Sequence, residues 1–322
     1  MTNQSPMTRS TGSGQAPAPS VGIVAVNYNG AAFIGEFAES LRGVRYPNFR
    51  LIVVDSASTD GSADELVRLV PDAVLLRSDE NLGTAAGNNR GIAYCLEHGF
   101  DYVLLLNNDT VLTEDFLDRL VAAAGERTLA VPKILYYFDR RLISTHAGDF
   151  DWRLGVFRHT FHGRPDSSAT GGPRELETAS FCCALVPAAA FREVGLLDER
   201  FFMYYEETDW LRQARDRGYR LLYRPEAVIY HRESASSGPP GAGWMTPFKH
   251  YYATRNRLYL VRKHSTSRGA YALFTAYFLA GRLFYLALHL LRRRPRLARA
   301  LVRGVLDYYR GRMGRTLEVG DL

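Results

Sequence analysis

The chain has 322 residues, which corresponds to two average domains or to one large α/β domain with an appendage. With 46% hydrophobic and 23% charged residues, the composition is that of a globular protein and excludes a fibrous, collagen-like or wholly disordered chain. The three cysteines include an adjacent pair, so we expect no disulfide framework and take a reducing compartment as the default.

The net charge of +6 conceals an asymmetry along the chain. Residues 246–322 hold 16 Lys and Arg against three Asp and Glu, a local balance of +13, so residues 1–245 carry −7. A basic region of this kind attracts a polyanion, which could be nucleic acid or an anionic membrane surface. The uncharged residues of the same region decide between these two alternatives.

The first 20 residues are dominated by Ser, Thr, Gly, Pro and Ala. Such a composition cannot bury enough apolar surface to offset the chain entropy lost on folding, so we expect residues 1–20 to be a disordered leader. No apolar run of the kind found in a secretory signal is present in this segment, and a secreted protein is not expected.

Order is expected to begin at Val21, where the run VGIVAVNY is typical of a buried parallel strand. Strand-like and helix-like segments then alternate as far as residue 124. The predicted strands cover residues 50–55, 73–77 and 102–106, and the predicted helices cover 32–42, 62–70, 85–98 and 114–124. This alternation predicts βαβ units, and hence a Rossmann-like α/β fold whose mostly parallel central sheet has helices on both faces.

The pattern changes after residue 130, where short strand-like pieces are joined by connections rich in Gly and Pro. One further helix is predicted over 206–218, and the loop at 233–243 is rich in turn-forming residues and is expected to be flexible. We interpret this region as mixed structure that completes the same domain, which gives a predicted domain over residues 21–245.

Polar residues follow the predicted strands at the point where each ends. Asn27-Tyr28-Asn29-Gly30 ends the first strand, Asp55-Ser56 the second, and Asn107-Asn108-Asp109 the strand at 102–106. Turn and cap chemistry explains each segment equally well by itself. Because ligands bind at the carboxyl ends of strands in such sheets, the three together predict one crevice. Asp109 and Asn107 could hold a hard cation such as Mg²⁺ or Mn²⁺ there, beside phosphate oxygens.

Six motifs occur in an order that resembles a known family. They are VNYNG, VDSASTDGS, NLGTAAGNNRG, LLLNNDT, FFMYYEETDW and HRES, and the likeness covers residues 21 to about 232. The chain resembles the family-two inverting glycosyltransferases of the GT-A fold, particularly bacterial rhamnosyltransferase-like members that extend lipid-linked or cell-surface glycans. The order and spacing of the motifs are specific for the fold and the reaction class, and not for the substrate.

The resemblance implies a nucleotide site. Asp55 would accept the imide N–H of a uracil or thymine ring, and Asn27 and Asn29 would face the nucleoside. The segment 81–91 would be the loop and helix start beneath the nucleotide, where small residues let the backbone approach the ligand. The other residues expected to bind the nucleotide are Ser56, Asn81, Gly83, Asn88 and Asn108. Thr84 stands where the family often has an aromatic or aliphatic residue.

The resemblance also implies a metal site. Asn107-Asn108-Asp109 corresponds to the DxD motif, with Asn in place of the first Asp, so we expect only modest affinity for the cation. The expected ligands are Asp109, Asn107 and His231, and the imidazole would favour Mn²⁺ over Mg²⁺. A histidine that is merely packed or exposed is the alternative for His231.

The acidic cluster Glu206-Glu207-Thr208-Asp209 matches the catalytic motif of the family. Glu207 would be the general base that takes the proton from the acceptor hydroxyl in a single in-line displacement with inversion. Glu206 would orient the acceptor or a neighbouring base, and Asp209 would support the helix. The alternative is a helix N-terminus whose acidic residues only complement the helix dipole.

The C-terminal residues 246–322 are expected to form a basic and aromatic helical region near a membrane. Residues 269–291 are long enough to span a bilayer, but Arg282 and His289 disfavour a clean span. Polar residues recur at every seventh position: Arg268, Thr275, Arg282, His289, Arg296, Arg303 and Arg310. Such a pattern predicts a helix or helix pair that lies in the plane of an anionic membrane surface. An intramolecular bundle or a homodimer contact is the alternative, whereas nucleic acid is not expected because it does not explain the apolar residues.

The resemblance therefore implies an inverting hexosyltransferase. It would use a divalent cation and a dTDP- or UDP-linked sugar, and its acceptor would be a glycan or a polyprenyl-linked sugar. Its predicted location is the cytoplasm, at the inner face of the membrane. A nucleotidyltransferase is the first alternative, but it would need a basic residue directly after the first strand. A non-catalytic membrane scaffold that binds nucleotide sugars is the second.

Overall fold

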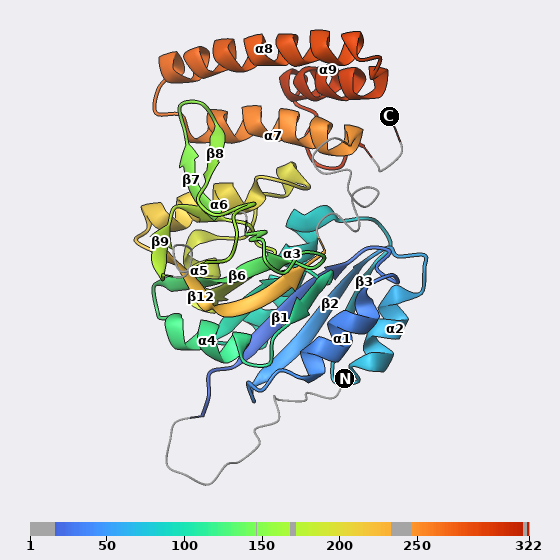
Figure 1. Ribbon diagram of the computed structural model, residues 1–322, viewed down its shortest axis with the longest axis vertical. Helices are drawn as coiled ribbons and strands as arrows, with labels where there is room; N and C mark the ends of the chain where they lie inside the picture. The colour runs from blue at the N-terminus through green and yellow to red at the C-terminus, as the bar shows by residue number, and fades with distance from the viewer. Residues whose placement is uncertain (1–16, 146, 168–171, 233–245, 318–320, 322) are drawn as a thin grey trace.

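The computed structural model describes residues 17–145, 147–167, 172–232, 246–317 and 321. Most of the predicted leader and the predicted flexible loop lie outside the described residues. An α/β body fills one end of the molecule, and three helices, α7 (Pro247–His264), α8 (Arg268–Leu291) and α9 (Pro295–Tyr309), form a layer at the other end (Figure 1). The C-terminal region is thus helical, as the sequence predicted.

A nine-stranded sheet is the centre of the body, with the strand order β3-β2-β1-β4-β11-β6-β12-β5 and β9 beside β12. Its strands are β1 (Val21–Asn27), β2 (Phe49–Ser56), β3 (Val74–Ser78), β4 (Tyr102–Leu106), β5 (Thr110–Leu112), β6 (Thr128–Tyr136), β9 (Arg174–Leu176), β11 (Cys183–Pro187) and β12 (Arg220–His231). The pairs among β1 to β4 and the pair β6–β12 are parallel, whereas β11, β5 and β9 run antiparallel to their neighbours. The predicted mostly parallel α/β sheet is confirmed.

Helices cover both faces of this sheet, because its central strands are apolar on both sides. Val24 of β1 packs into the core that includes residues of α3, α5 and α6, whereas Ile23 and Ala25 pack into the core beneath α1, α2 and α4. Alternate side chains of a strand point to opposite faces, so a nearly continuous apolar run is what a strand buried on both faces requires. The body helices are α1 (Ile34–Arg42), α2 (Ser62–Leu69), α3 (Gly83–Glu97), α4 (Phe116–Ala123), α5 (Ala188–Val194) and α6 (Glu206–Asp216).

A second, small sheet lies between the body and the helical layer. It consists of β10 (Thr178–Ala179), β7 (Ala147–Asp151) and β8 (Val156–His159), all antiparallel. The β7–β8 hairpin extends to helix α7 (Figure 1), where Arg257 donates a hydrogen bond to the carbonyl of Leu154 at 2.6 Å. The short 3₁₀ helix η2 (Glu199–Phe201) precedes α6 in the chain.

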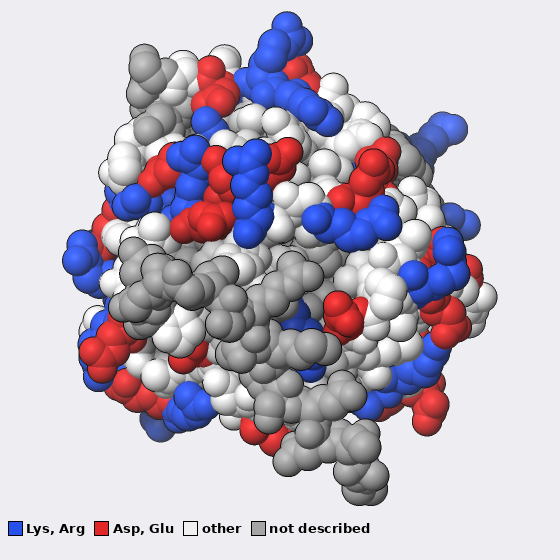
Figure 2. Space-filling model, turned by 90° about the horizontal axis from the view of Figure 1, so that it is seen from below, with Lys and Arg blue, Asp and Glu red and all other residues white. Residues whose placement is uncertain are grey.

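The end of the molecule opposite α8 and α9 carries basic and acidic side chains in alternation, without a large patch of one sign (Figure 2). The negative balance of residues 1–245 is therefore not gathered into an acidic surface on this face.

Glycines of α3 set how closely this helix approaches β1. A Cβ atom added to Gly91 would lie 2.3 Å from Val24 Cγ1, and one added to Gly87 would lie 2.9 Å from Val26 Cγ1. The sequence interpretation assigned the small residues of this segment to close approach of a ligand. At Gly87 and Gly91 the close neighbour is instead the adjacent strand.

We expect Gly91→Ala to lower the free energy of unfolding by about 1–3 kcal/mol, because the added methyl group overpacks the contact with Val24. Gly35→Ala is the matched control. This exposed helical position has no atom near the added Cβ, so we expect a gain of about 0.4–1 kcal/mol. Urea unfolding of both variants measures the difference, and equal stability of the two would contradict the close-packing explanation.

Candidate active site

The carboxyl ends of β1, β2 and β4 open into a cavity of about 470 Å³. A cavity of this volume is in the range that binds small molecules and cofactors. Most of the residues predicted from the motifs line it, namely Ser56, Asn81, Gly83, Asn88, Asn107, Asn108, Asp109, Glu206, Glu207 and His231. Asn27, Asn29, Asp55 and Asp209, which the motifs also indicated, do not line it. The structure thus brings together side chains from positions as distant as 56 and 231.

Asn27 and Asp55 lie directly behind the cavity wall, in a buried hydrogen-bond network. Asn27 Nδ2 donates to Asp55 Oδ1 at 3.0 Å and to Ser62 Oγ at 2.8 Å, and Asn108 Nδ2 donates to Asn27 Oδ1 at 2.7 Å. Asp55 is only 2% exposed. The network holds the ends of three strands in register, and Ser56, whose buried Oγ has no hydrogen-bond partner among the described residues, faces the cavity in front of it.

Asn29 has a different environment. It adopts a left-handed backbone (φ 51°), and its Oδ1 accepts a hydrogen bond from the backbone N–H of Thr59 at 2.9 Å. This side chain therefore joins the loops after β1 and β2, outside the residues that line the cavity.

Asp109 and His231 meet at the cavity wall because β5 pairs with the end of β12. Thr110 is opposite His231 in this antiparallel pair, and His231 Nε2 lies 3.1 Å from Asp109 Oδ1. Burial by itself lowers the pKa of His231, but Cys182 and the Asp109 carboxylate outweigh burial and raise this pKa well above its usual value. The Asp109 carboxylate and the His231 imidazole are therefore in contact at one place in the cavity wall.

The fit of a divalent cation can be judged from these donors. Within the described parts of the chain, no group of three or more His, Cys, Asp and Glu side chains could hold a metal ion. Asp109 and His231 offer one carboxylate and one imidazole, and the exposed Asn107 beside them offers an amide oxygen. This incomplete set fits a cation that takes its remaining ligands from phosphate oxygens.

Two adjacent carboxyl groups enter the cavity from the first turn of α6. Burial raises the pKa of Glu207 well above its usual value, and the neighbouring Glu206 carboxylate raises it further. Burial also raises the pKa of Glu206, although a hydrogen bond from Thr84 Oγ1 to Glu206 Oε1 opposes that rise. Because the sequence interpretation gave Thr84 no consequence, this contact is a feature that it missed. A buried carboxyl with a raised pKa beside a second acid is a typical candidate for proton transfer.

The loop before α6 has an unusual backbone conformation. Phe202, Tyr204 and Tyr205 all have positive φ angles, between 64° and 75°. Non-glycine residues in this region are strained and persist where the surroundings hold them. Gly83 also approaches the loop, since a Cβ atom on it would lie 2.4 Å from the Phe202 carbonyl oxygen.

Two buried side chains of α7 hold this loop. Asn256 Nδ2 donates to the carbonyls of Phe201, Met203 and Tyr204 at 2.9, 2.7 and 3.0 Å. Arg255 Nη2 donates to the Phe201 carbonyl at 3.0 Å, and both Arg255 and Asn256 are completely buried. Sequence reasoning missed these residues because they lie in the basic C-terminal region and belong to none of the motifs.

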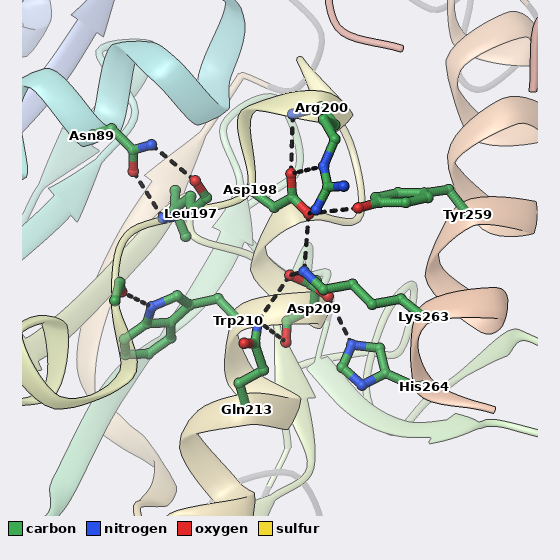
Figure 3. Close-up of polar contacts among 11 residues, drawn as sticks. Asn89, Leu197, Asp198, Arg200, Asp209, Trp210, Gln213, Tyr259, Lys263 and His264 are labelled. Atoms are coloured by element: carbon green, nitrogen blue, oxygen red, sulfur yellow. Dashed lines mark hydrogen bonds and ion pairs between the residues drawn. The ribbon is translucent and has the colours of Figure 1, made fainter. Parts of the chain in front are cut away.

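Asp209 does not line the cavity, and its side chain points toward α7 (Figure 3). Its carboxylate lies 2.7 Å from Lys263 Nζ and 2.7 Å from His264 Nε2. Lys263 also bridges to Asp198 at 2.9 Å. Burial raises the pKa of Asp198, but hydrogen bonds from Arg200, Lys263 and Tyr259 outweigh it and hold this pKa well below its usual value. These contacts fasten α6 to α7 within the same helical turn that carries Glu206 and Glu207, so the structure gives Asp209 a supporting position.

Residues 20–195 match the family model described as Glycosyl transferase family 2. The chain belongs to glycosyl transferase family 2. It is 27% identical over 266 residues to the N-acetylglucosaminyl-diphospho-decaprenol L-rhamnosyltransferase of Mycobacterium tuberculosis, with 76% of this chain and 84% of that protein covered. It is 22% identical over 220 residues to the dTDP-rhamnosyl transferase RfbF of Shigella flexneri, with 67% and 72% covered.

Solved structures share the fold of this glycosyltransferase. Residues 1–349 of S. aureus TarS in complex with UDP-GlcNAc superpose with a TM-score of 0.56 at 16% identity, covering 90% of this chain and 81% of that one. The mannosyltransferase PcManGT from Pyrobaculum calidifontis in complex with GDP-Man and Mn²⁺ gives a TM-score of 0.52 at 16% identity, covering 90% and 87%. The predicted GT-A fold is confirmed.

We expect Asn256→Ala to lower the free energy of unfolding by about 1–3 kcal/mol, because the partly buried Met203 carbonyl loses its hydrogen bond from Asn256. We also expect transferase activity to fall, since the loop before Glu206 loses its support. Asn48→Ala is the matched control: Asn48 donates to the Ala18 carbonyl, distant from the cavity, so activity should be unchanged. Urea unfolding and turnover measure the two effects, and an Asn256→Ala enzyme with normal activity would contradict this role of α7.

Proposed function

We propose that this glycosyltransferase transfers a hexose or deoxyhexose, such as rhamnose, from a dTDP- or UDP-linked donor to a hydroxyl group of a lipid-linked or cell-surface glycan, with inversion at the anomeric carbon. The observation that carries the proposal is the shared cavity of Glu207, with its raised pKa, and the Asp109–His231 pair. The printed names of the M. tuberculosis and S. flexneri relatives, both rhamnosyltransferases, support the choice of sugar.

Glu207 is the general base in this proposal. As the acceptor oxygen attacks the anomeric carbon, the hydroxyl proton moves to the Glu207 carboxylate and the nucleoside diphosphate leaves from the opposite face of the sugar. A base with a raised pKa accepts this proton more readily at neutral pH than an ordinary glutamate would. Glu206, which accepts a hydrogen bond from Thr84, orients the acceptor hydroxyl beside the base.

The donor would occupy the part of the cavity formed by the strand ends and the start of α3. Ser56 and Asn108 would contact the nucleoside. The buried hydrogen-bond network of Asn27 and Asp55 would either support the cavity wall behind them or rearrange so that Asp55 contacts the base. Asn81, Gly83 and Asn88 line the same cavity and would lie beneath the phosphates. Asp109, His231 and Asn107 would hold a divalent cation, which when bound neutralises charge on the leaving diphosphate.

We further propose that α8 docks the enzyme on the inner face of the cytoplasmic membrane. Among the described helices, α8 is long and apolar enough by composition to cross a membrane. However, its polar residues Arg282 and His289 face inward, toward α7, rather than toward solvent. The outward residues are large and apolar: Leu273, Tyr277, Leu283, Phe284, Leu290 and Leu291 are all more than half exposed. Arg292, Arg293 and Arg294 follow directly, so an anionic lipid surface complements this face.

We expect Glu207→Gln to lower turnover by about 10²–10⁴-fold while donor binding is retained, because the amide cannot accept the hydroxyl proton. Thermal shift with dTDP- and UDP-sugars in the presence of Mn²⁺ measures donor binding, and release of nucleoside diphosphate measures turnover with a polyprenyl-diphospho-sugar acceptor. Glu97→Gln, on the exposed surface of α3, is the control and should leave both unchanged. Near-normal turnover of Glu207→Gln would remove Glu207 from the mechanism.

The pH dependence offers a separate test of the Glu206–Glu207 pair. The base works only when deprotonated, so activity is lost as the pH falls through the raised pKa of Glu207. Glu206→Gln removes the negative charge that adds to this rise. We therefore expect the acidic limb of the kcat/KM profile to move to lower pH in Glu206→Gln. A limb that stays in place or moves to higher pH would show that Glu207 is not the group that titrates.

A further inference from the structure

Two arginines lie together between α7 and α8 without a carboxylate partner among the described residues. Arg257 and Arg282 form no ion pair there, and the Nε atom of each is buried without a hydrogen-bond partner. Arg257 donates to the Leu154 carbonyl, and Arg282 Nη1 approaches Thr254 Oγ1 at 3.4 Å. The two charges are close enough for Arg257 to lower the pKa of Arg282, which burial already lowers more strongly. Both guanidinium groups thus keep unused donors in a partly buried position.

Aromatic rings compensate these charges only in part. Phe278 lies 5.0 Å from the Arg257 guanidinium and 4.7 Å from that of Arg282, and Tyr285 lies 5.5 Å from Arg282. The rings of His250 and His289 meet edge to face with their centroids 5.2 Å apart beside them, which adds no negative charge. Desolvated cations without a counter-ion are energetically costly, so the cluster formed by Arg257 and Arg282 favours the binding of an anionic ligand.

Arg257 and Arg282 do not line the cavity themselves, but they lie close to residues that line it beside the proposed catalytic acids. Ala253, one helical turn before Arg257 on the same face of α7, lines the cavity together with Tyr205. Burial raises the pKa of the Tyr205 phenol, Arg257 and Arg282 oppose that rise, and Glu207 adds to it. Both guanidinium groups and the proposed base are therefore within electrostatic reach of one phenol.

The other side of the cluster reaches the outward surface of α8. Tyr277 and Tyr285 lie within electrostatic reach of Arg282, and they are 51% and 44% exposed. The exposed apolar residues Leu273 and Phe284 belong to the same surface. The two guanidinium groups, which have no carboxylate partner among the described residues, thus lie between the surroundings of Glu207 and an apolar exterior.

We propose that Arg257 and Arg282 bind the diphosphate of a lipid-linked acceptor, so that its sugar lies at Glu207 and its hydrocarbon chain lies along α8. This proposal rests on the lipid-linked acceptor of the proposed function. A guanidinium group donates two parallel hydrogen bonds to phosphate oxygens, and a diphosphate carries enough charge to balance both arginines. The order of these charged and apolar groups from Glu207 to α8 matches the order of sugar, diphosphate and lipid in such a molecule.

Farnesyl diphosphate is a suitable probe, because it carries the diphosphate and the lipid without requiring knowledge of the acceptor sugar. Calorimetry on the full chain, with dTDP, UDP and Mn²⁺ in excess to fill the donor site, would measure its Kd beside those of pyrophosphate and farnesol. We expect farnesyl diphosphate to bind more tightly than either. If pyrophosphate or farnesol binds as tightly as farnesyl diphosphate, the proposal is overturned, because the site would then not recognise both the diphosphate and the hydrocarbon chain.

Substitutions locate the binding. We expect Arg257→Gln/Arg282→Gln to weaken farnesyl diphosphate at least about tenfold, as the loss of charge-assisted hydrogen bonds predicts, and to leave farnesol unchanged. Arg262→Gln, an exposed arginine of α7, is the matched control and should bind like the wild type. An unchanged double variant, or an equal loss in the control, would overturn the proposal.

Two further measurements keep the result interpretable. If the double variant does not fold, as judged by its thermal unfolding, Arg282→Lys replaces it. This variant retains the charge but not the paired hydrogen bonds, and we still expect weaker binding; wild-type affinity would count against the site. The thermal shift with dTDP and UDP is measured in every variant. If dTDP and UDP cause no thermal shift in the wild type, the proposed donor is wrong. If they do cause a shift but farnesyl diphosphate does not bind, only the proposed diphosphate site is wrong.

Discussion

The position of the α6 N-terminus depends on polar side chains that α7 buries against it. Asn256 and Arg255 donate to carbonyls of the loop over residues 200–204, and Lys263 and His264 bind Asp209 on the far side of the helix. These contacts hold a strained backbone in one conformation, and that conformation directs Glu206 and Glu207 into the cavity. Without them, the loop would relax toward ordinary φ angles and the two acids would lose their common position.

The same arrangement explains the electrostatics of the cavity. Two carboxyl groups and a histidine–aspartate pair are buried around one cavity, and burial raises the pKa values of Glu207 and Glu206. Beyond them, Arg257 and Arg282 add positive charge for which the described residues supply no carboxylate partner. The basic excess of residues 246–322 is therefore divided between exposed arginines at the ends of α8 and α9 and buried cations that face the body. The basic residues of this region, which look alike in the sequence, therefore occupy two different environments in the structure.

Sequence reasoning predicted the parallel half of the sheet well, because each of its strands is a short apolar run followed by a helix. The strand predicted at 102–106 coincides with β4, and the helix predicted at 62–70 differs from α2 only at its last residue. It did not predict that β11 inserts antiparallel between β4 and β6. That pairing joins residues about eighty positions apart, and no local period in the sequence records it.

The site was predictable where polar residues follow strands, since topology alone brings Ser56, Asn108 and Asp109 to one edge. The supporting residues were not. Asn256 and Arg255 are ordinary members of a basic helix until the fold places carbonyl groups beside them, and the inward orientation of Arg282 depends on the packing of α8 against α7. The sequence interpretation expected a polar stripe at a membrane interface, whereas the structure buries part of that stripe.

Hydrogen exchange of the backbone amides of Thr84, Ala85 and Asp209 tests the supporting role of α7 most directly, because these amides donate to the Phe202 and Tyr205 carbonyls of the strained loop. The account predicts that they are protected in the wild type and exchange much faster in Asn256→Ala, while amides in β1 and β2 keep their rates. Unchanged protection at Thr84, Ala85 and Asp209 in a folded Asn256→Ala protein would contradict it.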